Sequence, residues 1–377
     1  MSFQKRCIGN WPFSPSRREF LGKSCSGAVA TCVGGRVAWG QASTGDSVQE
    51  STAGLQTRGL VLGVSDLKAL DWPLRAKQAG LTTIGTHISP GQVAGFIKSD
   101  QGQSFLQRCS MFGLEVEHEL HAISDLLPRS LFSKDPAMFR MNEKGERVAD
   151  WNFCVHSVNA IETICANAVE YAKTLKPTTG RYFYWIDDNR PMCHCTKCRV
   201  YSESDQALIL ENQLLGALRG VDPRATLAHL AYLKTLRPPT QVKPLPGVFL
   251  EFAPIVRSWN TPLSVLSHRP RPVRPSFPVH THGETLELLD ANLELFGRQD
   301  AQVLEYWLDV SLNSLWQRPA KKLPWREDVF LDDLQTYTRR GIRHITSFAV
   351  MIDDRYVQSY GEPTFVREYG RGLAASR

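Results

Sequence analysis

The chain has 377 residues, of which 42% are hydrophobic and 22% are charged, and its formal net charge is +6. This composition is ordinary for a soluble globular protein and excludes disorder over long stretches. No segment after residue 42 reaches the roughly 18 unbroken apolar residues of a membrane span, so we expect none.

The first 42 residues predict an export signal. The pair Arg17-Arg18 precedes a weakly apolar run at 27–38, and small residues end at Ala42. This order is typical of a twin-arginine signal, which predicts a periplasmic or extracellular protein. A disordered basic tail is the alternative. Residues 1–42 hold six basic residues and one acidic residue, which is +5 of the total +6. The basic balance therefore belongs to this segment and does not indicate a nucleic-acid surface.

Residues 43–56 predict a linker, and residues 57–377 predict a single domain in which strands and helices alternate. Eight strands are expected, at 60–65, 81–86, 114–120, 181–187, 226–232, 248–254, 302–308 and 344–350. Helices are expected at 66–79, 100–112, 156–175, 203–219, 283–297 and 326–340. The link between the fifth and sixth strands shows no clear helix.

Strands that alternate with helices imply parallel pairing, and eight such units close into a (β/α)₈ TIM barrel. An open doubly wound sheet is the alternative. It usually carries a Gly-rich phosphate turn after its first strand, whereas this chain has Gly63-Val64-Ser65-Asp66 there. The loops after the third, fourth and sixth strands are extended. Because barrel sites form at the C-terminal ends of the strands, we expect these loops to wall the site.

Acidic residues lie on or at the ends of four predicted strands. Alternation predicts an inward face for Glu117, Glu119 and His121 on the third strand, Glu251 on the sixth, and Glu305, Trp307 and Asp309 on the seventh. On the seventh strand, Leu304, Tyr306 and Leu308 would then face the helices. A buried, unpaired carboxylate costs several kcal/mol. A layer of salt bridges to Arg or Lys at the barrel centre is therefore the alternative for Glu117 and Glu251.

Two carboxyl groups on either side of a sugar ring are the requirement for glycoside hydrolysis. Asp187 and Asp188 end the fourth strand, and Glu305 lies on the seventh, so these three are the catalytic candidates. Asp188 would be the general acid and Glu305 the base or nucleophile. Asp187 would adjust the pKa of its neighbour or bind a ring hydroxyl group. The candidates for substrate binding are His87, Glu119, His121, Trp185, Tyr232, Glu251, Arg257, Trp259, Tyr306, Trp307 and Asp309.

The loop at 256–282 is rich in Pro and Arg. It contains Arg257, Arg269, Arg271 and Arg274 and no acidic residue. Such a loop over the site would favour an anionic sugar such as a uronic acid. The alternative is a solvated loop.

Cys193, Cys195 and Cys198 follow the fourth strand with the spacing C-x-C-x-x-C. Three thiolates and a fourth ligand would suit a structural zinc ion. The fourth ligand would be Cys154, His194 or a carboxylate. A disulfide, which export permits, is the alternative. Catalysis itself is expected to need no cofactor.

Several segments together resemble a bacterial family of exported domains of uncharacterised function, related to the alpha-glucuronidase and hexosaminidase barrels. The segments that carry the resemblance are Glu119-Leu120-His121-Ala122, Leu126-Leu127-Pro128-Arg129, Trp185-Ile186-Asp187-Asp188 with the cysteines, Leu230-Ala231-Tyr232, Phe249 to Ile255 with Arg257, and Glu305 to Asp309. The resemblance implies a barrel and a carbohydrate context, but no established reaction. Hexosaminidase-type barrels carry a neighbouring Asp-Glu pair where this chain has Asp187-Asp188, which argues against substrate-assisted chemistry.

The leading hypothesis is an exported glycoside hydrolase whose partner is a carbohydrate, with a uronate-containing polysaccharide as one candidate substrate. A non-catalytic glycan-binding barrel is the second hypothesis. A metal-dependent hydrolase built on His87 and His121 is the third, and no H-E-x-x-H motif supports it.

Overall fold

The structure is a computed structural model that describes residues 54–270 and 279–376. The predicted export signal at 1–42, most of the predicted linker, and Arg271 and Arg274 lie outside the described residues. Within the described part of the chain, no helix is both long enough and apolar enough to traverse a bilayer.

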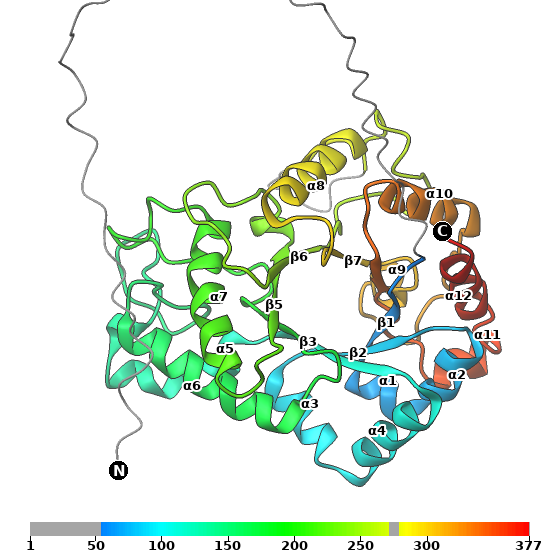
Figure 1. Cartoon of the computed structure of the whole chain (residues 1–377), viewed down its shortest axis with the longest axis horizontal. Coiled ribbons are helices and arrows are strands. Elements are labelled where there is room, and N and C mark those ends of the chain that lie inside the picture. The colour runs from blue at the N-terminus through cyan, green and yellow to red at the C-terminus, as the bar shows by residue number, and fades with distance from the viewer. Residues whose placement is uncertain (1–53, 271–278, 377) are drawn as a thin grey trace, which may run out of the picture. The chain divides into compact units, whose positions relative to one another are not determined.

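The described residues form a closed barrel of eight parallel strands that pair in chain order (Figure 1). The strands are β1 Thr57–Gly63, β2 Thr83–His87, β3 Glu115–His121, β4 Arg181–Trp185, β5 Thr226–Ala231, β6 Val248–Phe252, β7 Gln302–Glu305 and β8 His344–Ser347. Each strand pairs with the next, and β8 pairs with β1. The predicted (β/α)₈ barrel and all eight of its strands are therefore confirmed.

Helices connect most of the strands and surround the barrel (Figure 1). The α-helices are α1 Val64–Ala69, α2 Trp72–Gln78, α3 Pro90–Ile97, α4 Asp100–Phe112, α5 Ile123–Leu126, α6 Val158–Leu175, α7 Glu203–Arg219, α8 His282–Phe296, α9 Val310–Ser314, α10 Glu327–Thr338, α11 Asp354–Tyr360 and α12 Phe365–Ala375. The 3₁₀ turns are η1 Arg129–Ser133, η2 Pro136–Met138 and η3 Leu233–Thr235. As expected, no α-helix links β5 to β6.

The predicted helix at 66–79 is divided into α1 and α2. Asp71 ends the continuity because its side chain accepts a hydrogen bond from the backbone N–H of Leu74 and begins a new helix, with Pro73 in its first turn. The helices α3, α5, α9, α11 and α12 were not predicted. In α3, Gly91 and Gly95 weaken the helical signal of the sequence.

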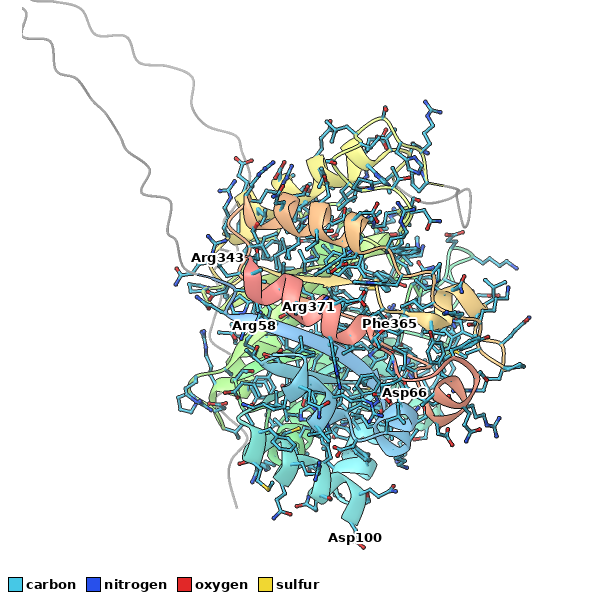
Figure 2. The ribbon with its side chains drawn as sticks, turned by 90° about the vertical axis from the view of Figure 1, so that its right-hand side faces the viewer. Arg58, Asp66, Asp100, Arg343, Phe365 and Arg371 are labelled. Atoms are coloured by element: carbon cyan, nitrogen blue, oxygen red, sulfur yellow. The ribbon has the colours of Figure 1, made fainter. Side chains whose placement is uncertain are left out.

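The C-terminal helix α12 lies over the seam where β1 meets β8. Figure 2 shows α12, between Phe365 and Arg371, alongside β1 with Arg58. The hydroxyl of Tyr369 donates a hydrogen bond to the carbonyl oxygen of Gly59 at 2.8 Å. This contact fixes the C-terminal helix to the strand that closes the barrel.

A polar layer fills the interior of the barrel below its C-terminal mouth. The Arg181 Nε lies 3.5 Å from Glu117 Oε1, and the Gln302 Nε2 lies 3.3 Å from Glu119 Oε1 and 3.2 Å from Glu251 Oε1. Burial raises the pKa of Glu119 well above its ordinary range and that of Glu251 to about 8. These acids therefore form part of the barrel core, together with the Arg181–Glu117 salt bridge.

Four loops meet at the C-terminal ends of the strands. Their described residues are 122–157 after β3, 186–202 after β4, 253–270 and 279–281 after β6, and 306–326 after β7. The first three were expected to be extended. The fourth, which contains α9, was not expected to be a wall of the site.

Candidate active site

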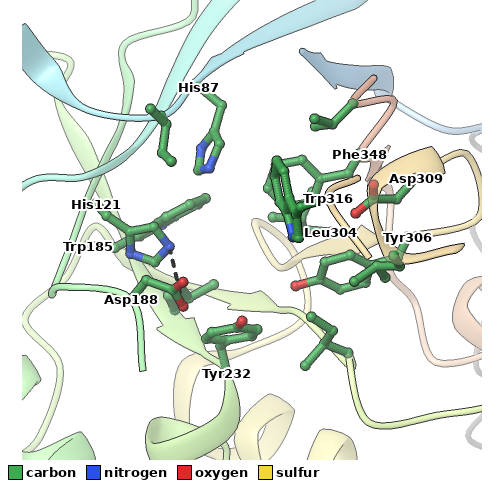
Figure 3. Close-up of a pocket in the computed structure, with 15 residues that line it drawn as sticks. His87, His121, Trp185, Asp188, Tyr232, Leu304, Tyr306, Asp309, Trp316 and Phe348 are labelled. Carbon is green, nitrogen blue, oxygen red and sulfur yellow. Dashed lines mark ion pairs between the residues drawn. The ribbon is translucent and has the colours of Figure 1, made fainter. Parts of the chain in front are cut away.

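A pocket of about 150 Å³ opens at the C-terminal mouth of the barrel (Figure 3). Its lining residues come from the ends of β2 to β8 and from the loops that follow them. Seven predicted site residues line it: His87, His121, Trp185, Asp188, Tyr232, Tyr306 and Asp309. The pocket is smaller than the roughly 300–1,000 Å³ of a drug-sized site, and it therefore suits a group of about one ring.

Two carboxyl groups face this pocket from opposite sides, Asp188 after β4 and Asp309 after β7 (Figure 3). The Asp188 side chain is 60% exposed, and its Oδ1 lies 4.0 Å from the Nε2 of His121. Asp188 is therefore open to solvent and lies beside an imidazole ring.

Asp309 lies in the opposite kind of environment. It is the N-cap residue of α9, where its Oδ1 accepts hydrogen bonds from Ser311 N at 2.8 Å and Ser311 Oγ at 2.6 Å. Burial raises the pKa of Asp309 to about 6, against the hydrogen bonds from Ser311 that lower it. The pocket therefore holds one exposed and one buried carboxyl group, an arrangement that suits a base and an acid.

Both histidines of the pocket are oriented by backbone carbonyl groups. His87 Nδ1 lies 2.6 Å from Glu119 O, and His121 Nδ1 lies 2.8 Å from Ile186 O. Because a carbonyl oxygen only accepts, each Nδ1 carries a proton and donates it. Burial and the neighbouring His121 lower the pKa of His87 to about 3, so His87 is neutral. Its Nε2 is then a hydrogen-bond acceptor for a ligand.

Aromatic rings form much of the remaining wall. The indole N–H of Trp185 donates to Glu251 Oε2 at 2.8 Å, which fixes the ring at the mouth of the polar interior layer. Tyr306 and Phe348 stack with ring centroids 5.4 Å apart. Rings of this kind offer flat apolar faces beside polar edges, and Tyr232 adds a further ring to the lining.

Asp187 does not face the pocket. Its carboxylate accepts hydrogen bonds from the N–H and hydroxyl of Ser124, both at 3.0 Å, and from Asn152 N at 2.8 Å. In return, the backbone N–H of Asp187 donates to Asn152 Oδ1 at 2.9 Å. Asp187 therefore ties the loop after β3 to the end of β4, and its predicted catalytic role is not supported by this geometry.

The predicted inward position of Glu305 is wrong. Glu305 accepts hydrogen bonds from Arg257 Nη1 at 2.8 Å and from the hydroxyl of Tyr337, on the outer side of the barrel wall. Gln302 bonds to residues inside the barrel, so it points inward and sets the alternation of β7. Leu304 and Tyr306 then face the pocket instead.

Other predicted substrate-binding residues are also structural. Trp307 donates its indole N–H to Asp333 at 3.0 Å and packs against Phe330 of α10. Trp259 lies behind Tyr306, with ring centroids 6.1 Å apart, and does not line the pocket. Glu119 and Glu251 belong to the polar layer below it. The alternative of a salt bridge at the barrel centre therefore applies to Glu117, which pairs with Arg181.

Arg257 is buried between two acids and cannot reach a substrate. Its Nη1 lies 2.8 Å from Glu305 and its Nη2 lies 2.6 Å from Asp333, and all three side chains are 0% exposed. The acids raise the pKa of Arg257 above its ordinary value. Arg257 was expected to hold an anionic sugar, and that expectation is wrong.

Replacing Arg257 by methionine should lower the free energy of unfolding by about 3–5 kcal/mol, because two buried carboxylates lose their counter-charge. Chemical denaturation measures this change. The matched control is Arg326→Met, which removes an exposed ion pair with Asp328 and should cause a far smaller loss, because solvent screens that pair. Equal losses in the two variants would show that the Arg257 cluster does not hold the barrel wall.

Four cysteines meet between the loops after β3 and β4. The Sγ atoms of Cys154, Cys193, Cys195 and Cys198 all lie within 4.8 Å of one another and are buried. Cys154 Sγ lies 3.8 Å from Cys195 Sγ and 3.7 Å from Cys198 Sγ, and the four are free cysteines. A zinc ion with Zn–S bonds of about 2.3 Å spaces its four sulfurs by about 3.8 Å. The four cysteines could therefore hold a metal ion.

The surroundings of the cluster also suit thiolates. The N–H of Met141 points at Cys193 Sγ at 3.3 Å, and Arg147 Nη1 lies 3.7 Å from the same sulfur. His194, an alternative fourth ligand, is 40% exposed and lies near Glu143 instead. Between 54–270 and 279–376, this cluster is the one compact group of metal-ligating side chains. His87, His121 and Asp188 do not form a second one.

Sequence reasoning missed several lining residues. They are Ile88, Leu230, Ile255, Leu304, Leu312, Trp316, Phe348 and Val350. Leu304 was missed because the alternation of β7 was assigned to the wrong face. Trp316 lies in a loop after α9, and no motif in the neighbouring sequence indicates that this loop belongs to the site.

The comparisons with known proteins agree with the fold. Residues 93–271 match the model of a family described as a domain of unknown function, DUF4838. No curated protein matches the sequence. Among solved structures, the chain is similar to catalytic domain 2 of the Group II chitinase of Ostrinia furnacalis, with a TM-score of 0.50 and 9% identity over 85% of this chain and 97% of that one.

Two further structures are similar at lower scores. The chitinase RmChi1 of Rhizomucor miehei has a TM-score of 0.48 and 11% identity over 84% of this chain and 100% of that one. A beta-galactosidase from the psychrophilic Marinomonas ef1 has a TM-score of 0.48 and 11% identity, and the chain covers 58% of its length. Likeness at such identity shows the fold alone. The comparisons therefore support the barrel fold, and residues 93–271 match the model of DUF4838.

Proposed function

We propose that the pocket binds one sugar ring and that the protein is a glycoside hydrolase. The observation that carries this proposal is the pair Asp188 and Asp309 on opposite sides of a pocket that is about one ring in size and walled by aromatic side chains (Figure 3). A pair of carboxyl groups placed across a sugar is the common requirement of retaining and inverting hydrolysis.

Asp309 is the proton donor in this proposal. Its raised pKa keeps a proton on the carboxyl group in weakly acidic solution. That proton passes to the glycosidic oxygen as the bond to the anomeric carbon breaks. Asp188 then acts as the carboxylate that takes a proton from the attacking water or that attacks the anomeric carbon itself. His87, a neutral acceptor, receives a hydrogen bond from a sugar hydroxyl.

The substrate that the pocket favours is a neutral sugar. No lysine or arginine is among the residues that line the pocket in the described part of the chain. A uronate carboxylate in this pocket would face Asp188 and Asp309 without a counter-charge, which is unfavourable. We therefore do not include a uronic acid in the proposal.

We also propose that the protein is exported, on the strength of the arginine pair and apolar run in residues 1–42. Cell fractionation tests this proposal. Replacing Arg17-Arg18 by Lys-Lys should retain the precursor in the cytoplasm, and unchanged export would contradict a twin-arginine signal.

The cysteine cluster is proposed to bind a structural zinc ion. Four buried thiols at tetrahedral spacing, with N–H groups directed at Cys193, support a closed site without an open position for chemistry. When bound, the ion would join Cys154 of the loop after β3 to the three cysteines after β4. Asn152 and Asp187 join the same two loops close by.

A hydrolysis screen tests the proposed function. The mature protein is incubated with glycosyl fluorides and oligosaccharides of neutral hexoses, N-acetylhexosamines and uronic acids. We expect release of product from a neutral sugar. Binding of a sugar without any turnover would instead support a glycan-binding barrel, and neither binding nor turnover of any probe would contradict the proposal.

The pH profile should show which carboxyl group is the acid. Because Asp309 must be protonated, kcat/KM should fall as the pH rises through about 6, the raised pKa of this group. Initial rates between pH 4 and pH 9 measure this limb. A rate that stays constant across that range would rule out Asp309 as the donor.

A further inference from the structure

We infer that Trp316 binds a second sugar ring, next to the ring in the pocket, so that the substrate is an oligosaccharide or polysaccharide. This inference rests on the proposed function. Its first support is the exposure of an apolar pair: Leu315 is 70% exposed and Trp316 is 65% exposed. Large apolar side chains exposed together in water often mark a surface that binds a ligand.

The backbone at this point is strained. Leu315 has a φ of +51° and Trp316 has a φ of +59°, a left-handed conformation that residues other than glycine seldom adopt. Strain of this kind persists only where the surrounding structure imposes it, and it gathers at ligand-binding sites. Two consecutive residues share it here, and both expose apolar side chains.

Hydrogen bonds on both sides hold the strained turn in place. The backbone N–H of Trp316 donates to Ser311 O at 3.0 Å, and that of Gln317 donates to Ser314 O at 3.0 Å. Farther along, the N–H of Lys321 donates to Ser314 Oγ at 2.9 Å. The indole ring is therefore presented by a fixed loop, so little conformational freedom is lost when a ligand stacks on it.

The position of Trp316 at the edge of the pocket indicates where a second sugar ring would lie. Its ring lines the same pocket as Asp309 and Leu312, yet most of its surface faces solvent (Figure 3). Because the pocket has a volume of only about 150 Å³, a second ring joined to the first must leave through the mouth. Ile88, which is 42% exposed, is a further apolar residue of the lining. The second ring would therefore lie on the indole face.

The experiment compares Trp316→Ala with the wild type on two substrates of the same sugar. One is the glycosyl fluoride, whose leaving group is too small to reach Trp316, and the other is the tetrasaccharide. We expect KM for the tetrasaccharide to rise by about 3- to 10-fold, the effect of one lost aromatic contact. KM for the fluoride should rise by a clearly smaller factor, because the first ring also contacts Trp185 and Tyr306 on the other walls of the pocket. Trp316→Phe, which keeps a ring, should recover most of the loss.

The matched control is Trp151→Ala. Trp151 is also exposed, at 36%, but it stacks on Arg190 and does not line the pocket. This variant should leave both substrates unchanged. Equal losses on both substrates in Trp316→Ala would overturn the second-ring inference while leaving the proposed function intact. A change from dimer to monomer in Trp316→Ala, with both KM values unaltered, would assign the surface to self-association and would also overturn it. If no sugar is bound or cleaved by the wild type, both proposals fall.

Discussion

Asp188→Asn and Asp309→Asn should each lower kcat by about 10²- to 10⁴-fold, the range expected when a general acid or base is removed. Each change keeps the size of the side chain and removes its ability to exchange a proton at the reacting atoms. The fall of activity above about pH 6 reflects the loss of the proton from Asp309. Only Asp309→Asn should therefore also remove this fall. Initial rates across pH on the best substrate of the screen measure both effects.

Three control variants separate chemistry from folding. Asp100→Asn changes an exposed acid at the start of α4, at the edge of the molecule in Figure 2, which does not line the pocket, and it should leave the rate unchanged. Glu305→Gln and Asp187→Asn should lower the free energy of unfolding, because both acids hold other residues in place. If Asp188→Asn and Asp309→Asn retained full turnover, the assignment of this pair would be wrong.

Removal of zinc should lower the thermal stability of the protein. The protein should contain one zinc ion per chain by elemental analysis, and Cys154→Ser should abolish it. Zinc sites of this type contribute folding free energy directly, and we expect Tm to fall by about 5–10 °C. Activity should fall with it, because the loop that carries Asp188 also carries Cys193, Cys195 and Cys198.

Cys109→Ala is the matched control for the cluster. Cys109 is a buried free cysteine in α4, outside the cluster, so its replacement should leave the zinc content unchanged. Non-reducing mass spectrometry of the mature protein gives an independent measurement. A Cys154 disulfide to any of the three cysteines, with no zinc present, would replace the metal site by the alternative that export permits.

The order of the elements could be predicted from the sequence because the barrel repeats one simple unit. Most strands are short apolar or alternating runs, and the long helices carry an apolar stripe, so periodicity separated them. Alternation also placed Glu117, Glu119 and His121 correctly, since β3 runs without interruption through all three residues. The short helices α3 and α9 were missed because glycine and serine dominate their signals.

The site was predicted only in part, and β7 shows why. At 304–309, one alternating set is Glu305, Trp307 and Asp309, and the other is Leu304, Tyr306 and Leu308. Both sets contain an aromatic residue, so the sequence does not reveal which set faces inward. The buried Arg257 decided the matter by pairing with Glu305, and Arg257 lies in a loop 48 positions earlier in the chain. Asp309 was predicted to face the pocket from the inner side of the seventh strand. It lines the pocket as the N-cap residue of α9 instead, because β7 ends at Glu305.

The position of Trp316 could not be predicted from the sequence either. Its place in the pocket lining depends on a left-handed turn after α9 that no residue type nearby demands. The cysteines illustrate the opposite case. Their spacing indicated a metal or a disulfide, and the structure narrowed the choice of fourth partner to Cys154, which lies 39 positions before Cys193.

The most direct measurement is a crystal structure of Asp309→Asn with an oligosaccharide that the wild type cleaves. We predict one sugar ring against Trp185 and Tyr306, with its glycosidic oxygen within about 3.2 Å of residue 309 and its anomeric carbon facing Asp188. A sugar bound at another surface, or a ring in the pocket whose scissile bond lies near neither residue, would contradict the assignment of this barrel mouth as the catalytic centre.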